Sequence, residues 1–138
     1  MTVKKLDRNF FQRLFGVCVT RKPAKQEGWT FESGKLTVDL QAMPELSPEG
    51  SAVRLEGKGL AEPLLLVHGD DGGFHAFRNR CTHGKRALDP VPGTGTVQCC
   101  SVGTSTFDYS GKLIEGPAKG PLAVYGVEKQ GETLLITL

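Results

Sequence analysis

The sequence contains no long hydrophobic run, little net charge and few cysteines, and each absence argues against a class of protein. No stretch approaches the ~20 consecutive apolar residues that a membrane helix needs. The first residues lack the uninterrupted apolar segment of a secretory signal. The net charge of +2 is too small to indicate nucleic-acid binding. We therefore expect a cytoplasmic protein with no membrane span and no nucleic-acid partner.

Common catalytic motifs are also missing. The chain has no glycine-rich nucleotide-binding loop and no Ser/His/Asp set. Nothing in it resembles a substrate site, so we expect a protein that is not a catalyst in its own right.

The four cysteines are too few for a disulfide scaffold in a chain of 138 residues. Three of them, Cys81, Cys99 and Cys100, lie within a stretch of twenty residues. Such clustering favours metal binding over disulfide stapling.

The apolar pattern predicts a single, mostly β domain. Eighteen glycines and eight prolines indicate many turns. Leu36, Val38 and Leu40 alternate with polar residues, and apolar runs at 63–69 and 73–79 flank an Asp-Asp-Gly-Gly turn. Further strands are predicted within 52–56, 96–98, 106–111, 122–128 and 133–138. Short strands at this spacing predict an antiparallel sandwich or small barrel.

The N-terminal segment differs in charge from the rest of the chain. Residues 1–25 carry seven lysines or arginines and one aspartate, a net charge of +6, which leaves −4 for the remainder. Apolar residues at helical spacing predict a short helix ending near Gly16. Its apolar positions are Phe10, Phe11, Leu14 and Phe15, with Leu6 before them.

Three interpretations of this segment stay open: packing on its own domain, docking on a larger protein, or anchoring at a membrane surface. The charge and the apolar spacing together lead us to expect a docking arm for a larger redox enzyme. We divide the chain into a basic arm and linker over residues 1–28 and a compact domain over residues 29–138.

Cys81 and His83 follow the strand predicted at 73–79, where a rigid backbone can aim them into a loop. Both are good metal ligands. Cys99 or Cys100 follows a Gly/Pro-rich turn and a second short strand. Two ligand-bearing loops that converge on one centre are typical of a Rieske site, in which two histidines replace two cysteines on one iron of a [2Fe–2S] cluster.

Longer segments resemble the Rieske iron–sulfur domain family over roughly residues 36–138. The matching stretches are LLLVHGDDGGFHAFRNRCTH, the V-x-C that follows a Gly-rich turn, FDYSG and GPAKGPLAVYGVE. The resemblance implies a Rieske-like antiparallel fold with two cluster-binding loops and a one-electron carrier, either a small ferredoxin or an accessory redox subunit. It makes Gly116-Pro117-Ala118 the counterpart of the loop that shields the cluster. It also makes Ser105 and Tyr109 candidates for hydroxyls that tune the cluster.

The second loop departs from the family pattern Cys-Pro-x-His-Gly followed by phenylalanine. If Cys99 is the ligand, Val102 occupies the histidine position and Phe107 lies one residue too far along. If Cys100 is the ligand, the phenylalanine spacing is restored but Gly103 occupies the histidine position. Neither register supplies a second histidine.

Four alternatives follow for the metal centre. Cys81, His83, Cys99 and Cys100 could hold an atypical [2Fe–2S] cluster, because adjacent Cα atoms are only ~3.8 Å apart. An oxygen ligand could come from Thr104, Ser105 or Asp108, or from outside the chain. The same Cys₃His set could bind Zn²⁺ tetrahedrally. Finally, the fold could have lost its metal and serve as an interaction module, with structural cysteines or a strained vicinal disulfide.

Overall fold

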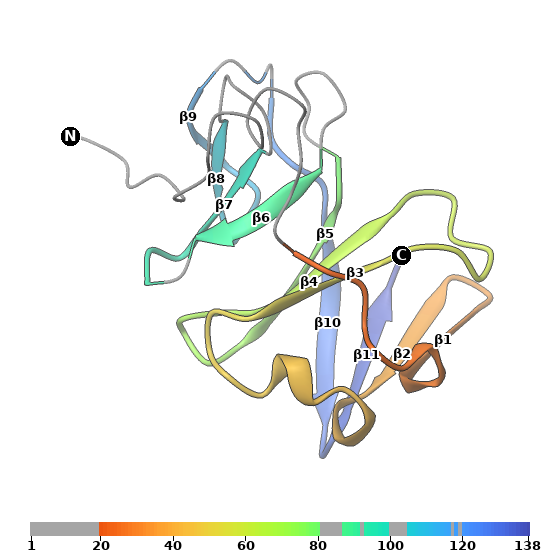
Figure 1. The fold of residues 1–138 in the computed structure, drawn as a ribbon. Coiled ribbons are helices and arrows are strands. Elements are labelled where there is room, and N and C mark those ends of the chain that lie inside the picture. The colour runs from red at the N-terminus through yellow and green to blue at the C-terminus, as the bar shows by residue number, and fades with distance from the viewer. Residues whose placement is uncertain (1–19, 81–86, 92, 100–104, 117, 119) are drawn as a thin grey trace.

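The protein is described by a computed structural model, which places residues 20–80, 87–91, 93–99, 105–116, 118 and 120–138. These residues form strands, loops and three short 3-10 turns, at Gln26–Gly28, Leu40–Ala42 and Pro44–Leu46 (Figure 1). The strands are β1 Trp29–Glu32, β2 Lys35–Asp39, β3 Ala52–Leu55, β4 Leu64–His68, β5 Phe74–Arg78, β6 Leu88–Val91, β7 Thr96–Cys99, β8 Thr106–Asp108, β9 Leu113–Glu115, β10 Val124–Gln130 and β11 Thr133–Thr137. The predicted all-β fold is confirmed.

The strands form two antiparallel sheets. The larger has the order β1-β2-β11-β10-β5-β4-β3, and the smaller has the order β6-β7-β8-β9. Figure 1 shows the smaller sheet as a distinct unit above the curled larger sheet. The loop after β5 leads into the smaller sheet, and the segment after β9 returns the chain to β10.

Each sheet has its own hydrophobic core, and β4 contributes to both. Leu64 and Leu66 pack with Trp29 and other residues inside the larger sheet. Leu65 and Val67 face the other way and pack with residues of the smaller sheet. Because both faces of β4 are buried, its sequence is a continuous apolar run instead of the alternation of a half-buried strand.

Three strands, β1, β6 and β9, were not predicted from the sequence. Strand β6 contains Pro90, which has no backbone N–H and is normally excluded from the middle of a sheet. It is tolerated here because β6 is an edge strand that pairs with β7 alone.

The predicted helix and the docking residues Phe10, Phe11, Leu14 and Phe15 lie outside the described residues. Among the residues that are placed, no helix is long and apolar enough to cross a membrane.

Residues 20–25, expected to be part of a polar linker, lie against the domain. The backbone N–H of Thr20 donates to Asp89 Oδ1 at 2.8 Å. The carbonyl of Arg21 accepts from the N–H of Arg54 at 3.0 Å, and the N–H of Ala24 donates to the Glu45 carboxylate at 2.7 Å. The division between arm and domain near residue 28 stays a prediction.

Two truncations test where the folded domain begins. Removing residues 1–19 should leave the free energy of unfolding almost unchanged, because the three contacts of residues 20–25 remain. Removing residues 1–25 should lower it by about 2–4 kcal/mol, at roughly 1 kcal/mol for each lost hydrogen bond. Urea denaturation measures both values. If removing residues 1–19 already lowers the free energy of unfolding, the arm packs on its own domain and is not free to dock elsewhere.

Candidate metal centre

The two loops predicted to bind metal leave the smaller sheet at the same end. Strand β6 begins at Leu88, just after the loop that contains Cys81 and His83, and β7 ends at Cys99, just before the loop that begins at Cys100. Leu88 and Cys99 are paired across β6 and β7. The strand pairing therefore brings the end of the first loop beside the start of the second.

The second loop is closed at its base by a backbone hydrogen bond. The N–H of Cys99 donates to the carbonyl of Ser105 at 2.8 Å, so the chain returns beside the point where it left. Of the predicted ligands, Cys81, His83, Cys100 and Thr104 lie outside the described residues. Their roles stay predictions.

Of the neighbouring cysteines Cys99 and Cys100, the structure describes Cys99. Cys99 is the last residue of β7, is fully buried, and belongs to the same apolar core as Val97 and Phe107. Cys100 follows it directly in the sequence and lies outside the described residues. Substitutions at Cys99 thus affect both the end of the sheet and the core, and they need a separate stability control.

Ser105 joins this end of the sheet to the segment 116–118. Its side-chain Oγ accepts a hydrogen bond from the N–H of Ala118 at 3.0 Å, and the residue is fully buried. Gly116 has φ +113°, and a Cβ atom there would lie only 2.5 Å from Ser105 Cα. Gly116 and Ala118 therefore lie against Ser105, the residue directly before β8.

Asp108 and Tyr109 lie at the opposite end of the smaller sheet. Asp108 pairs with Thr96, the first residue of β7, whereas the metal loops leave near Cys99, its last residue. Asp108 Oδ1 accepts from the backbone and hydroxyl of Ser110, at 2.9 and 2.6 Å, and from the N–H of Lys112 at 3.0 Å. Burial alone would raise the pKa of Asp108, but these hydrogen bonds outweigh it and lower the pKa. Its carboxylate stabilises a turn, and its role as an alternative ligand stays a prediction.

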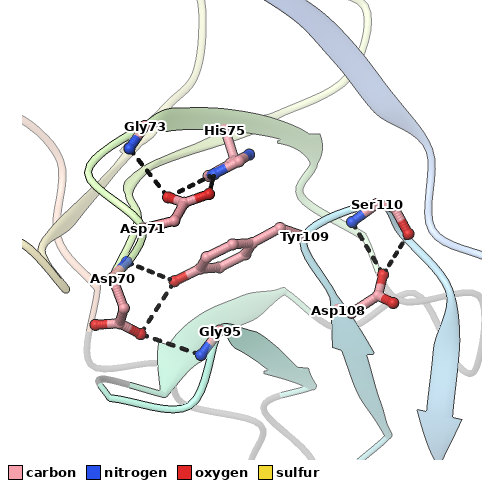
Figure 2. Close-up of polar contacts among 8 residues, drawn as sticks. All are labelled: Asp70, Asp71, Gly73, His75, Gly95, Asp108, Tyr109 and Ser110. Carbon is pink, nitrogen blue, oxygen red and sulfur yellow. Dashed lines mark hydrogen bonds and ion pairs between the residues drawn. The ribbon is translucent and has the colours of Figure 1, made fainter.

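The Tyr109 hydroxyl is engaged by Asp70 of the β4–β5 turn (Figure 2). It accepts from the Asp70 N–H at 3.1 Å and donates to Asp70 Oδ2 at 3.2 Å, and the same carboxylate oxygen accepts from the N–H of Gly95 at 3.1 Å. The Tyr109 ring stacks on His75 at 4.3 Å between centroids. Tyr109 thus ties the two sheets together, and its predicted role as a cluster-tuning hydroxyl stays a prediction.

Burial and hydrogen bonding oppose each other in this contact. Burial alone would raise the pKa of Asp70, but hydrogen bonds from the turn around Gly95 and from Tyr109 outweigh it and lower the pKa. Burial raises the pKa of Tyr109. Its hydroxyl is therefore protonated and donates a hydrogen bond to the Asp70 carboxylate.

Exchanging Tyr109 for phenylalanine tests this contact. The variant loses two hydrogen bonds to Asp70, one of them to a charged carboxylate. Its free energy of unfolding should therefore be lower by about 1–3 kcal/mol. Tyr125→Phe is the matched control, because the Tyr125 hydroxyl has no hydrogen-bond partner among the described residues. Urea denaturation of both variants measures the difference, and equal stability losses would contradict the role of the hydroxyl.

The two described histidines do not replace the missing second ligand. His68 Nδ1 lies 2.7 Å from the carbonyl of Leu46, and His75 Nε2 lies 3.0 Å from the Asp71 carboxylate. Both histidines lie toward the turn of the β4–β5 hairpin, whereas the first metal loop follows the other end of β5, after Arg78. Of the three histidines in the sequence, His83 alone lies outside the described residues, and its role as an imidazole donor stays a prediction.

Sequence reasoning missed Asn79, which lies two residues before Cys81. Its side-chain Oδ1 accepts a hydrogen bond from the N–H of Leu88 at 2.8 Å. This contact spans the whole first loop. The signal in the sequence that could have identified it is an asparagine at the end of a predicted strand, two residues before a predicted ligand.

The described geometry is shared with known proteins. The sequence profile of the Rieske [2Fe-2S] domain matches residues 36–126. The ferredoxin subunit of 3-phenylpropionate/cinnamic acid dioxygenase from Escherichia coli (strain K12) is 30% identical over 93 residues, which cover 66% of this chain and 84% of that subunit. The subunit of the same name from Shigella boydii serotype 4 has the same identity and coverage.

Solved structures share the fold at lower identity. The ferredoxin of carbazole 1,9a-dioxygenase from Nocardioides aromaticivorans IC177 superimposes with a TM-score of 0.57 at 21% identity, covering 67% of this chain and 91% of that one. The plasma membrane Rieske protein of Synechocystis PCC 6803 gives a TM-score of 0.56 at 24% identity, covering 70% and 94%. By the extent of the sequence match and by the two loops at one end of the smaller sheet, the chain belongs to the Rieske [2Fe-2S] domain family.

Proposed function

We propose that this protein is a Rieske-type ferredoxin, a one-electron carrier that serves a larger redox enzyme and performs no catalysis itself. The observation that carries the proposal is the pairing of Leu88 with Cys99, which brings the two ligand-bearing loops to one end of the smaller sheet. The ferredoxin subunits it resembles are matched over 84% of their length. When bound, a [2Fe–2S] cluster supplies a single-electron redox couple. We place this carrier in the cytoplasm.

We propose Cys81, His83, Cys99 and Cys100 as the ligands. His68 and His75 lie toward the other end of their hairpin, which supports a ligand set with one imidazole. Thiolates are the usual ligands of iron–sulfur clusters. An oxygen ligand is less suited to iron–sulfur chemistry, and the Ser105 oxygen already accepts from Ala118.

Burial of the described residues at this end of the sheet supports a centre shielded from water. Cys99 and Ser105 are fully buried, and the segment that contains Gly116 and Ala118 packs against Ser105. Solvent exclusion and hydrogen bonding around a cluster are what tune its reduction potential in a given protein.

The reduction potential tests the ligand set. A thiolate in place of one imidazole adds negative charge and stabilises the oxidised state, so the potential should fall below the about −150 to +300 mV of Cys₂His₂ Rieske centres, toward the about −400 mV of all-thiolate ferredoxins. With one imidazole left, the potential should depend only weakly on pH. Voltammetry between about pH 6 and 10 measures both properties. A high potential with two titrating groups would contradict the proposed ligands.

The missing second histidine favours one competing function, a metal-free interaction module on the same fold. Iron and sulfide analysis of anaerobically purified protein, together with its visible absorption, separates the two. Equal amounts of iron and sulfide support the ferredoxin. Zinc without sulfide indicates a structural metal site, and the absence of both indicates the metal-free module.

We propose that the basic arm contributes to docking on the partner enzyme, through Phe10, Phe11, Leu14 and Phe15. Residues 1–25 of the arm carry a net charge of +6, and the remainder of the chain carries −4. This charge suits a partner surface with an acidic rim, where complementary charges raise the rate of association.

A further inference from the structure

The base of the first metal loop is closed by the side chain of Asn79. This residue directly follows β5, is only 2% exposed, and accepts a hydrogen bond from the N–H of Leu88 at 2.8 Å through Oδ1. Its own backbone N–H donates to the carbonyl of Pro63 at 2.8 Å. Asn79 is therefore fixed to the larger sheet and in turn holds the first residue of β6.

The residues around Asn79 are also restrained. The Glu62 carboxylate lies between two arginines, with Oε1 3.1 Å from a terminal nitrogen of Arg78 and Oε2 3.1 Å from Nε of Arg80. Arg80 directly precedes Cys81. These partly exposed ion pairs contribute little energy, but they restrict the direction in which the chain enters the loop.

A continuous set of contacts crosses the base of both loops. Asn79 binds Leu88, Leu88 pairs with Cys99, and Cys99 donates to Ser105. The side-chain amide is the one member of this set that joins β5 of the larger sheet to β6 of the smaller sheet. Its loss would free the end of the first loop to move relative to the second, while the pairing within each sheet persists.

We propose that Asn79 is a positioning residue for the metal centre, whose amide oxygen sets the distance between the two ends of the first loop and so the placement of Cys81 and His83. This inference rests on the proposed function. Ligands must be held within about 0.5 Å of their productive geometry. The residues that orient metal ligands typically contribute 10–100-fold to metal affinity.

Three variants of the full chain test the inference. Asn79→Ala removes the acceptor, and Asn79→Asp retains an acceptor oxygen at the same position. Thr94→Val is the matched control, because it removes a 2.7 Å hydrogen bond to the Val91 carbonyl at the other end of the same sheet. The measurements are the rate of iron release to a chelator, the electron paramagnetic resonance spectrum of the reduced protein, and the exchange rate of the Leu88 amide hydrogen.

In Asn79→Ala, iron release should accelerate about tenfold or more, the resonance spectrum should change, and the Leu88 amide should exchange faster. Asn79→Asp should restore the original spectrum, and Thr94→Val should retain it. An unchanged spectrum and release rate in Asn79→Ala would overturn the inference. So would equal iron release in Asn79→Ala and Thr94→Val, or failure of the aspartate to restore the spectrum.

The failure of the proposed function has a different signature. A wild-type protein that contains no iron would overturn the ferredoxin and the positioning role together. If the wild-type protein holds its cluster and only the Asn79 variants behave like the control, the ferredoxin stands and the positioning role alone is wrong.

Discussion

Replacing Cys81 with serine should give a folded protein that binds no iron. The first loop contributes one thiolate and one imidazole, and a hydroxyl is a much poorer donor to iron than a thiolate. The strands on both sides of the loop are held by their own pairing, so the fold should survive. The change is measured as loss of the visible absorption and of bound iron, with far-ultraviolet circular dichroism as the check on folding. A Cys81→Ser protein with full iron content would show that this cysteine is not a ligand.

The second loop separates the competing ligand sets through its two cysteines. Cys100→Ser should lose the cluster or change its paramagnetic spectrum if Cys100 is the fourth ligand. Cys99→Ser also places a hydroxyl in an apolar core, where an unsatisfied polar group costs about 1–3 kcal/mol. Cys99→Ala is the matched variant that removes the thiol without adding that polar group. Full iron occupancy in the serine variants of both cysteines would overturn the assignment.

The missing imidazole can also be put back. Val102→His places a histidine at the family position for the Cys99 register, most informatively together with Cys100→Pro. A paramagnetic spectrum typical of two histidine ligands would show that the second loop keeps a Rieske geometry. If the spectrum does not change, the reason is the extra residue before Phe107, which alters the spacing of the second loop from the family pattern.

Replacing Gly116 with alanine should lower the free energy of unfolding by about 2–5 kcal/mol. The new side chain would have φ +113° and a Cβ atom 2.5 Å from Ser105 Cα. Backbone strain of this kind costs about 1–3 kcal/mol, and overpacking a buried contact costs a similar amount. The strain is relieved only if the segment moves away from Ser105, which would break the hydrogen bond from the Ala118 N–H.

Gly120→Ala is the control for this substitution. Gly120 lies four residues further along, and a Cβ atom there would meet nothing within 4 Å. The free energy of unfolding of the Gly120→Ala variant should change by no more than about 0.5 kcal/mol. Urea denaturation of the metal-free proteins compares the two variants without any contribution from a cluster. Equal losses would mean that the contact between Gly116 and Ser105 is not what holds the segment in place.

Most of the strands could be predicted because their apolar residues follow the period of a strand and turn residues separate them. Strand β6 was missed because Pro90 is compatible with a strand only at the edge of a sheet, and edge position is a property of the tertiary fold. The continuous apolar run of β4 was predicted as a strand, but its burial on both faces became visible only when two sheets were in place.

The candidate site was predictable to the extent that ligand chemistry is local. Cys81, His83 and the cysteine pair stand out by residue type and spacing alone. Tyr109 was assigned to the cluster by its resemblance to a family position, whereas its hydrogen bonds to Asp70 of the β4–β5 turn depend on the tertiary fold and could not be predicted from the sequence. Asn79 was missed because its partner is a backbone N–H on the far side of a loop, and such a contact leaves no periodic signal in the sequence.

The double burial of β4 has a consequence for how the protein unfolds. Leu64 and Leu66 belong to one core and Leu65 and Val67 to the other, so neither core can open without exposing residues of a strand that the other core needs. Regions that share their buried contacts in this way open together as one cooperative unit. The smaller sheet is therefore not an independent flap held in place by a metal. Protein without a cluster should therefore keep the strands of both sheets.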